Sequence, residues 1–159
     1  MSEQQDDGRG QPAQADPAGG PVVVGVDGSE SSKEALRWAA RMAAVEGVRI
    51  RALAAWEYPQ AYNSPVDVNW RPDVDAQTVL DDTLREVFGD ERPAGLEAEV
   101  VHGPARTVLL DASVGATLLV VGSRGHGGFA GLLLGSVSSA CAEHAHCPVL
   151  VVHEEHDRR

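Results

Sequence analysis

Two short runs of apolar residues place the tightest limits on how this chain can fold. Residues 22–26 read VVVGV and residues 118–121 read LLVV, with no polar side chain in either run. Strands that expose one face to water alternate polar and apolar residues, whereas strands buried on both faces do not. The two runs therefore predict inner strands of a parallel sheet with helices packed on both of its faces.

The rest of the chain supplies further strands and helices in regular alternation. Further strands are predicted at 48–56, 96–100 and 149–152, and helices at 30–46, 74–88, 104–113 and 136–143. This alternation is the order of a parallel, doubly wound sheet. We predict a single α/β domain over residues 21–153, with its ligand site beyond the carboxyl ends of the strands.

The helix predicted at 30–46 carries signals at both of its ends. Ser31 and Glu34 have the spacing of a capping box, in which both side chains satisfy N–H groups at a helix start. Gly47 follows the last helical residue and predicts a glycine C-cap.

The two ends of the chain differ from this core in composition. Residues 1–20 are rich in Gln, Asp, Gly, Ala and Pro, so we predict a disordered tail there, and a frayed end at 154–159. The first residues have neither a basic start nor an apolar stretch, and no apolar run reaches the roughly 18–20 residues of a membrane helix. We therefore expect a cytoplasmic protein without a membrane segment.

Charge and residue types narrow the kinds of ligand that the chain can bind. A formal net charge of −11 leaves no basic patch for the phosphates of nucleic acid, so nucleic-acid binding is not expected. Lys33 is the sole lysine, and it follows a serine instead of the glycine that precedes the lysine of a Walker phosphate loop. A metal site is not expected, because His144 and His146 lack the spacing of ligands on one helical face. Cys141 and Cys147 are expected to be buried, inert thiols.

The most informative segment leaves the strand at 118–121, passes through a glycine-rich loop and enters the helix at 136–143. Glycines permit positive φ angles and close approach of a ligand, and successive N–H groups in such a loop form a concave site for anions. The helix start adds unpaired N–H groups and the positive end of the helix dipole, and Arg124 is expected to add charge from the rim. The candidate phosphate-binding residues are Gly122, Ser123, Arg124, Gly125, His126, Gly127, Gly128, Gly135, Ser136 and Val137.

The loop also fits the pattern G-x2-G-x9-G-[ST], which resembles the ATP-binding signature of the universal stress protein family. The residues at the signature positions are Gly122, Gly125, Gly135 and Ser136. Residues 23–29, VVGVDGS, are similar to the first strand and acidic residue of that family, and residues 147–152, CPVLVV, to its last strand. The resemblance covers about residues 21–153.

This resemblance implies a five-stranded sheet of order 3-2-1-4-5 that binds ATP, with Mg²⁺, between the ends of the first and fourth strands. It implies that Asp27 contacts the ribose or the adenine, and that Gly25 and Val26 pack against the nucleoside. Ala55 would lie against the adenine, and the glycine loop would wrap the phosphates. From the residues alone, Asp27 could instead cap the first helix. The resemblance also implies a homodimer paired through the last strand, residues 149–152.

The function expected from these features is that of an ATP-binding regulatory module in the stress response, whose nucleotide state is read by an unidentified protein partner. No catalytic residue is predicted, because no lysine and few carboxylates lie near the loop. Two alternatives stay open: a slow Mg²⁺-dependent ATPase, and a dimeric interaction protein that works without a nucleotide. A different nucleotide, such as AMP or a flavin, is a further alternative.

Overall fold

The computed structural model describes residues 19–59, 67–125 and 134–154. Strands and helices alternate through these residues as the sequence predicts. The elements are β1 (Val22–Gly25), α1 (Glu30–Glu46), β2 (Ile50–Trp56), α2 (Pro72–Phe88), β3 (Leu96–His102), α3 (Ala105–Ser113), β4 (Leu118–Gly122), α4 (Ser136–His144) and β5 (Val149–Val152).

The five strands form one parallel sheet of order β3-β2-β1-β4-β5. The first strand lies at the centre, where Val24 pairs with Ala52 of β2 on one side and with Val120 of β4 on the other. The strand order reverses at β1, because the chain winds outward through β2 and β3 and then returns to β4 and β5. The predicted doubly wound α/β fold and its strand order are confirmed.

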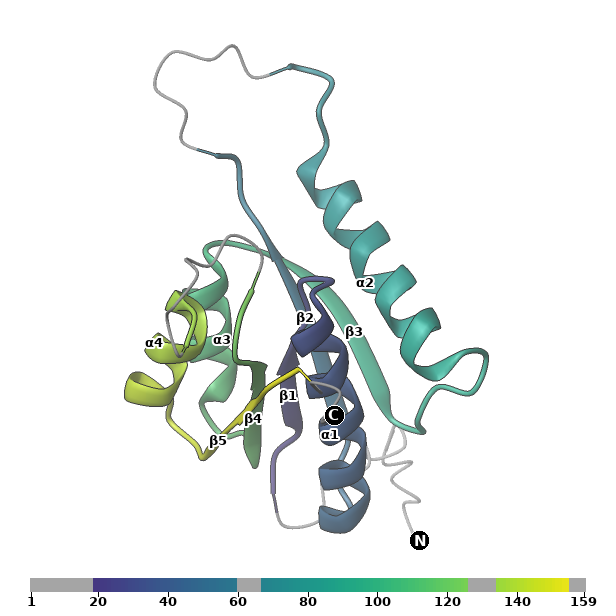
Figure 1. The fold of residues 1–159 in the computed structure, drawn as a ribbon, viewed down its shortest axis with the longest axis vertical. Coiled ribbons are helices and arrows are strands. Elements are labelled where there is room, and N and C mark those ends of the chain that lie inside the picture. The colour runs from purple at the N-terminus through teal and green to yellow at the C-terminus, as the bar shows by residue number, and fades with distance from the viewer. Residues whose placement is uncertain (1–18, 60–66, 126–133, 155–159) are drawn as a thin grey trace, which may run out of the picture.

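Helices cover both faces of the sheet, with α1 and α2 on one face and α3 and α4 on the other (Figure 1). Successive side chains of a strand point to opposite faces, so the two faces have separate cores. Val22 and Val24 pack in the cluster that holds Leu36 of α1 and Leu80 of α2. Val23 packs in the other cluster, whose helix residues include Val108, Leu109 and Cys141. Continuous apolar strands are therefore needed at the centre, as residues 22–26 and 118–121 predict.

The first helix begins at the predicted residue but is capped by a different serine. Ser29 is the N-cap, and its hydroxyl accepts a hydrogen bond from the Ser32 N–H at 3.2 Å. The predicted capping box of Ser31 and Glu34 is wrong: Ser31 lies inside the helix, and Glu34 pairs with Arg37. Ser31 cannot be the cap because the N-cap is the residue just before the first helical residue, and this helix starts at Glu30.

The chain makes defined contacts from Gly20 onward. The Thr117 hydroxyl donates to the Gly20 carbonyl at 2.7 Å, and the Thr117 N–H donates to the Pro21 carbonyl at 3.0 Å. Apart from Gly19, Gly20 and Glu154, the residues predicted to form a disordered tail and a frayed end lie outside the described part of the chain. Within the described ranges, no helix has both the length and the apolar character that crossing a lipid bilayer requires.

Candidate functional site

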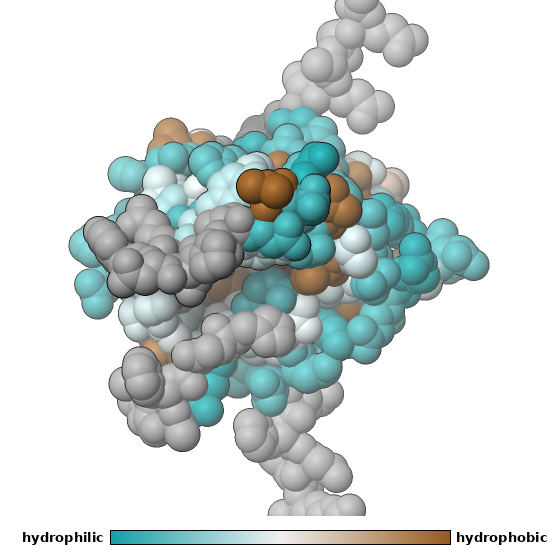
Figure 2. All heavy atoms as spheres, turned by 90° about the horizontal axis from the view of Figure 1, so that it is seen from above, coloured by the Kyte–Doolittle hydropathy of each residue, from teal (hydrophilic) through white to brown (hydrophobic). Residues whose placement is uncertain are grey.

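A pocket of about 460 Å³ opens at the carboxyl ends of β1, β2 and β4. This is the position at which the strand order reverses, where open α/β sheets commonly bind ligands. Seen from above, the surface is hollowed at this edge of the sheet, and apolar residues line part of the hollow (Figure 2). Walls come from both helical layers, because residues of α2 and α3 face each other across the strand ends.

Most of the residues that the sequence predicts for a ligand site lie in this pocket. The predicted residues that line it are Gly25, Val26, Asp27, Ala55, Gly122, Arg124, Gly125, Gly135, Ser136 and Val137. Ser123 lies behind the lining instead: it is buried, and its carbonyl accepts hydrogen bonds from the Gly135 N–H at 2.7 Å and the Ser138 hydroxyl at 3.0 Å. His126, Gly127 and Gly128 lie outside the described residues.

The pocket lining also includes residues that the sequence patterns did not predict. The additional lining residues are Ser29, Ser32, Leu53, Ala54, Ala76, Val79, Ala105, Val108, Leu109, Val121 and Ser138. Ser29 and Ser32 follow the predicted Asp27 so closely that proximity in the sequence could have included them. The residues of α2 and α3 carry no such signal, since only tertiary packing brings those helices to the strand ends.

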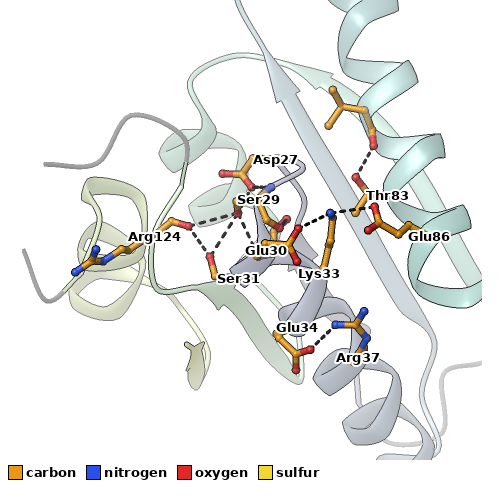
Figure 3. Close-up of polar contacts among 12 residues, drawn as sticks. Asp27, Ser29, Glu30, Ser31, Lys33, Glu34, Arg37, Thr83, Glu86 and Arg124 are labelled. Carbon is orange, nitrogen blue, oxygen red and sulfur yellow. Dashed lines mark hydrogen bonds and ion pairs between the residues drawn. The ribbon is translucent and has the colours of Figure 1, made fainter. Parts of the chain in front are cut away.

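The turn between β1 and α1 carries Asp27 (Figure 3), which is exposed and lines the pocket. Its Oδ1 atom accepts hydrogen bonds from the Ser29 N–H at 2.9 Å and from the Ser29 hydroxyl at 2.5 Å. The same hydroxyl caps α1, so Asp27 supports the start of that helix through Ser29. The carboxylate therefore has a structural role, and it also lies where a ligand in the pocket would meet it.

The three signature glycines differ in what they accommodate. A Cβ atom on Gly122 would lie 2.4 Å from the Ser31 hydroxyl oxygen and 2.8 Å from the Ser31 carbonyl carbon, so this glycine allows β4 to approach α1. A Cβ on Gly125 would lie 2.8 Å from Oδ2 of Asp27, whereas one on Gly135 would meet nothing closer than 3.5 Å. None of the three has a positive φ angle, so the first two serve close approach and not a left-handed backbone.

Hydrogen bonds hold the start of the loop against α1. The Arg124 carbonyl accepts from the Ser31 hydroxyl at 2.5 Å, and the Ser29 hydroxyl lies 3.4 Å from the same oxygen. The Arg124 guanidinium points away from Asp27 (Figure 3). Arg124 thus meets α1 through its main chain, and it also belongs to the pocket lining.

Helix α4 starts at the pocket, and residues 135–138 belong to its lining. Its N-cap, Gly135, supplies no side-chain cap, and the Ser139 N–H donates to the Gly135 carbonyl at 3.0 Å. The N–H groups of residues 136–138 precede that bond along the helix, so an anion in the pocket could accept hydrogen bonds from them. Ser138 is buried, and its hydroxyl is 3.1 Å from the Gly135 carbonyl, whereas Ser136 is exposed at the lining.

An ion-pair bridge fixes α2 against α1 beside the pocket. Nζ of Lys33 lies 2.7 Å from Oε1 of Glu30 and 2.9 Å from Oε2 of Glu86 (Figure 3). Hydrogen bonds to these two carboxylates raise the pKa of Lys33, and the bond to Lys33 lowers the pKa of Glu30. The sole lysine of the chain is therefore engaged between helices, not at the glycine loop. The described residues contain no cluster of three or more His, Cys, Asp or Glu side chains that could hold a metal ion.

Comparison with known proteins places this geometry in a family. A sequence model described as the universal stress protein family matches residues 20–153. A universal stress protein of Mycobacterium tuberculosis strain H37Rv is 37% identical over 145 residues, which cover 84% of this chain and 48% of that protein. The chain thus spans about half the length of the curated relatives that it matches.

Two solved structures share the fold. A universal stress protein crystallised in complex with cAMP is 29% identical, with a TM-score of 0.64, over 87% of this chain and 100% of that one. A family protein of Arabidopsis thaliana with AMP bound is 25% identical, with a TM-score of 0.57, over 87% of this chain and 94% of that one. The family match, the sheet order and the pocket at its switch point agree, and the chain belongs to the universal stress protein family.

Proposed function

We propose that this protein is an ATP-binding universal stress protein that acts as a nucleotide-dependent regulatory module. The observation that carries the proposal is the pocket at the strand ends, which joins an apolar wall to a glycine loop and an uncapped helix start. A nucleotide needs both environments, because its base is apolar on its faces and its phosphates are anionic. The relatives that are solved with cAMP and with AMP support a nucleotide as the ligand.

The lining suggests which end of the pocket takes which part of the ligand. Ala55 and Leu109 belong to the apolar end, where a base would bury its ring faces. Asp27 lies between the two ends and would accept hydrogen bonds from ribose hydroxyls. The phosphates would lie against Gly125 and the start of α4, whose N–H groups and dipole favour negative charge.

A magnesium ion would enter with the phosphates. Mg²⁺ prefers oxygen ligands and is usually held by one or two carboxylates together with substrate phosphates. With Asp27 assigned to the ribose, the described lining offers the exposed Ser136 hydroxyl beside the phosphate oxygens for this purpose. When bound, the ion would neutralise part of the charge on the phosphates.

A homodimer through β5 completes the proposal. β3 and β5 are the two edge strands of the sheet, but β3 carries Glu97 and Glu99, which form ion pairs with Arg49 and with Arg51 of β2. Charged side chains on an edge strand discourage association, whereas β5 reads VLVV and has three half-buried residues. Pairing of β5 with its copy would cover this edge. The proposal includes a cytoplasmic location and a protein partner that reads the nucleotide state.

Calorimetry with one glycine variant tests the nucleotide site. Gly122→Val is unsuitable, because its side chain would collide with α1. Gly135→Val should keep the fold, since its Cβ meets no atom closer than 3.5 Å, and should place two methyl groups against the loop. We expect ATP with Mg²⁺ to bind wild type and the control Ala142→Val, on the exposed side of α4, and to bind Gly135→Val at least about tenfold more weakly. Equal affinity in all three proteins would refute the site.

A further inference from the structure

Helix α2 contributes a wall to the pocket, and nothing in the glycine signature points to it. Ala76 and Val79 both line the pocket. Residues three apart lie on the same face of a helix, so these two side chains form one continuous strip toward the strand ends. We infer that Ala76 of this strip determines the size of the base that the pocket admits, an inference that rests on the proposed nucleotide site.

The side chains around the strip of Ala76 and Val79 are suited to contact with a flat ring. Ala54 and Ala55 lie at the end of β2, and Val108 and Leu109 lie on α3 across the strand ends. All of these side chains are apolar, and the alanines leave room because they extend only one carbon from the backbone. The charged and hydroxyl side chains of the described lining belong to the β1–α1 turn, the first turn of α1, the start of the loop and α4. An apolar ring would therefore lie beside α2, away from the phosphate end.

Exposure of the strip supports a bound group at this position. Val79 is 37% exposed although it lies in a concave site, and Ala76 is half-buried. A ring between α2 and α3 would cover this apolar surface and remove it from water. The next turn of α2 differs, because Leu80 and Leu84 are fully buried in the core.

The helix is anchored independently of Ala76. Its core contacts come from Leu80, Thr83 and Leu84, and its ion pair with Lys33 comes from Glu86. A larger side chain at position 76 would therefore extend into the pocket without displacing a core residue. The size of that side chain should control how large a base can enter.

Titration of one variant with three ligands tests the inference. Ala76→Phe should weaken ATP binding by at least about tenfold. The same substitution should leave the affinity for inorganic tripolyphosphate unchanged, because that ligand carries the phosphates without a base. CTP, whose base has one ring, should lose less affinity than ATP. Val74→Phe is the control. It adds a similar side chain at an exposed position of α2 that does not line the pocket, and it should change the affinity for none of the three ligands.

The outcomes separate this inference from the proposed function. If wild type binds ATP and Ala76→Phe binds it equally well, the inference is wrong and the nucleotide site stands. An equal loss of affinity for ATP and for tripolyphosphate would also overturn the inference, because position 76 would then affect the whole pocket. If wild type binds neither ligand, both proposals fail. Ala76→Val provides a milder variant, with an expected ATP affinity between those of wild type and Ala76→Phe.

Discussion

Gly122 illustrates a residue that belongs to a ligand-binding signature and is also required for packing. Its missing Cβ leaves room for Ser31, whose backbone carbonyl carbon would lie 2.8 Å away. Gly122→Ala should lower the free energy of unfolding by about 1–3 kcal/mol, the usual cost of forcing extra volume into a packed contact. Gly135→Ala should change it by no more than about 0.5 kcal/mol, because its Cβ has ordinary contacts. Urea denaturation of both variants measures this difference, and equal stabilities would contradict it.

Cys141 gives the core a dependence on high pH. Burial, with a smaller effect from Cys147, raises the pKa of Cys141 from 9.0 to about 11. A raised pKa in the folded state means that the stabilisation is complete below pH 9.0 and is lost as the pH rises through about 11. The free energy of unfolding should therefore fall more steeply over this range in wild type than in Cys141→Ala. Denaturation curves at a series of pH values test this, and parallel declines would refute it.

The pocket residues argue for slow hydrolysis of any ATP that is bound. Main-chain N–H groups and a helix dipole hold the ground state and the transition state about equally, which does not accelerate the chemical step. Asp27 is the one carboxylate in the lining that the structure describes, and Ser29 already donates two hydrogen bonds to it. We expect single-turnover hydrolysis well below the ~1–100 s⁻¹ of phosphoryl-transfer enzymes. Release of phosphate within seconds, abolished in Asp27→Asn with binding retained, would make the protein an ATPase.

The candidate site could be predicted from the sequence wherever its residues follow a strand or belong to the loop. Asp27 and Ser136 were found because each stands at the end or start of an element next to the switch point. Ala76 of α2 and Leu109 of α3 could not be predicted as site residues. Helical periodicity shows which residues of one helix share a face, but it does not show what that face contacts. The bond from the Ser31 hydroxyl to the Arg124 carbonyl was equally inaccessible, because only tertiary contact brings α1 to the start of the loop.

At the scale of elements, the sequence predicts well which helices and strands exist and in which order they follow. It predicts their first and last residues less well. Helix α2 starts at Pro72, two residues before the predicted start, because proline suits the first turn of a helix. Strand β2 starts at Ile50 and not at Val48, whose N–H still donates to Ala43 at the end of α1. Strand β3 runs to His102, two residues beyond its predicted end at residue 100.

The ion-pair bridge between α1 and α2 should matter for how firmly α2 is held. Lys33→Met should lower the melting temperature, and the difference from wild type should shrink in high salt, which screens ion pairs. The lowered pKa of Glu30 adds a pH test: its stabilisation is present above its ordinary pKa of 4.5 and is lost as the pH falls through the folded value. Arg85→Met is the control, because Arg85 pairs with Asp82 within α2 and does not bridge helices. Equal effects of the two substitutions at all salt concentrations would contradict the bridging role.

At the scale of the whole molecule, the proposed homodimer depends on pairing through the edge strand β5. The carbonyls of Pro148 and Val152 accept from the N–H groups of Leu119 in β4 and of Ser123 just after it. The alternation of a parallel ladder therefore directs the N–H of Val151 to the free edge. Light scattering should show wild type at about twice the chain mass of 16.8 kDa. Val151→Pro should be monomeric, because proline removes an edge donor without breaking the pairing to β4. A monomeric wild type, or a variant that stays dimeric, would refute pairing through β5.

The most direct test of the account is to identify what occupies the pocket of the purified protein. Wild type and Gly135→Val would be incubated with ATP and Mg²⁺, separated from free nucleotide by gel filtration and denatured, and the released small molecules would be identified by mass spectrometry. We expect an adenine nucleotide at up to about one per chain in wild type and a much lower amount in Gly135→Val, with both proteins folded. Absence of nucleotide from wild type, or equal amounts in the two proteins, would contradict it.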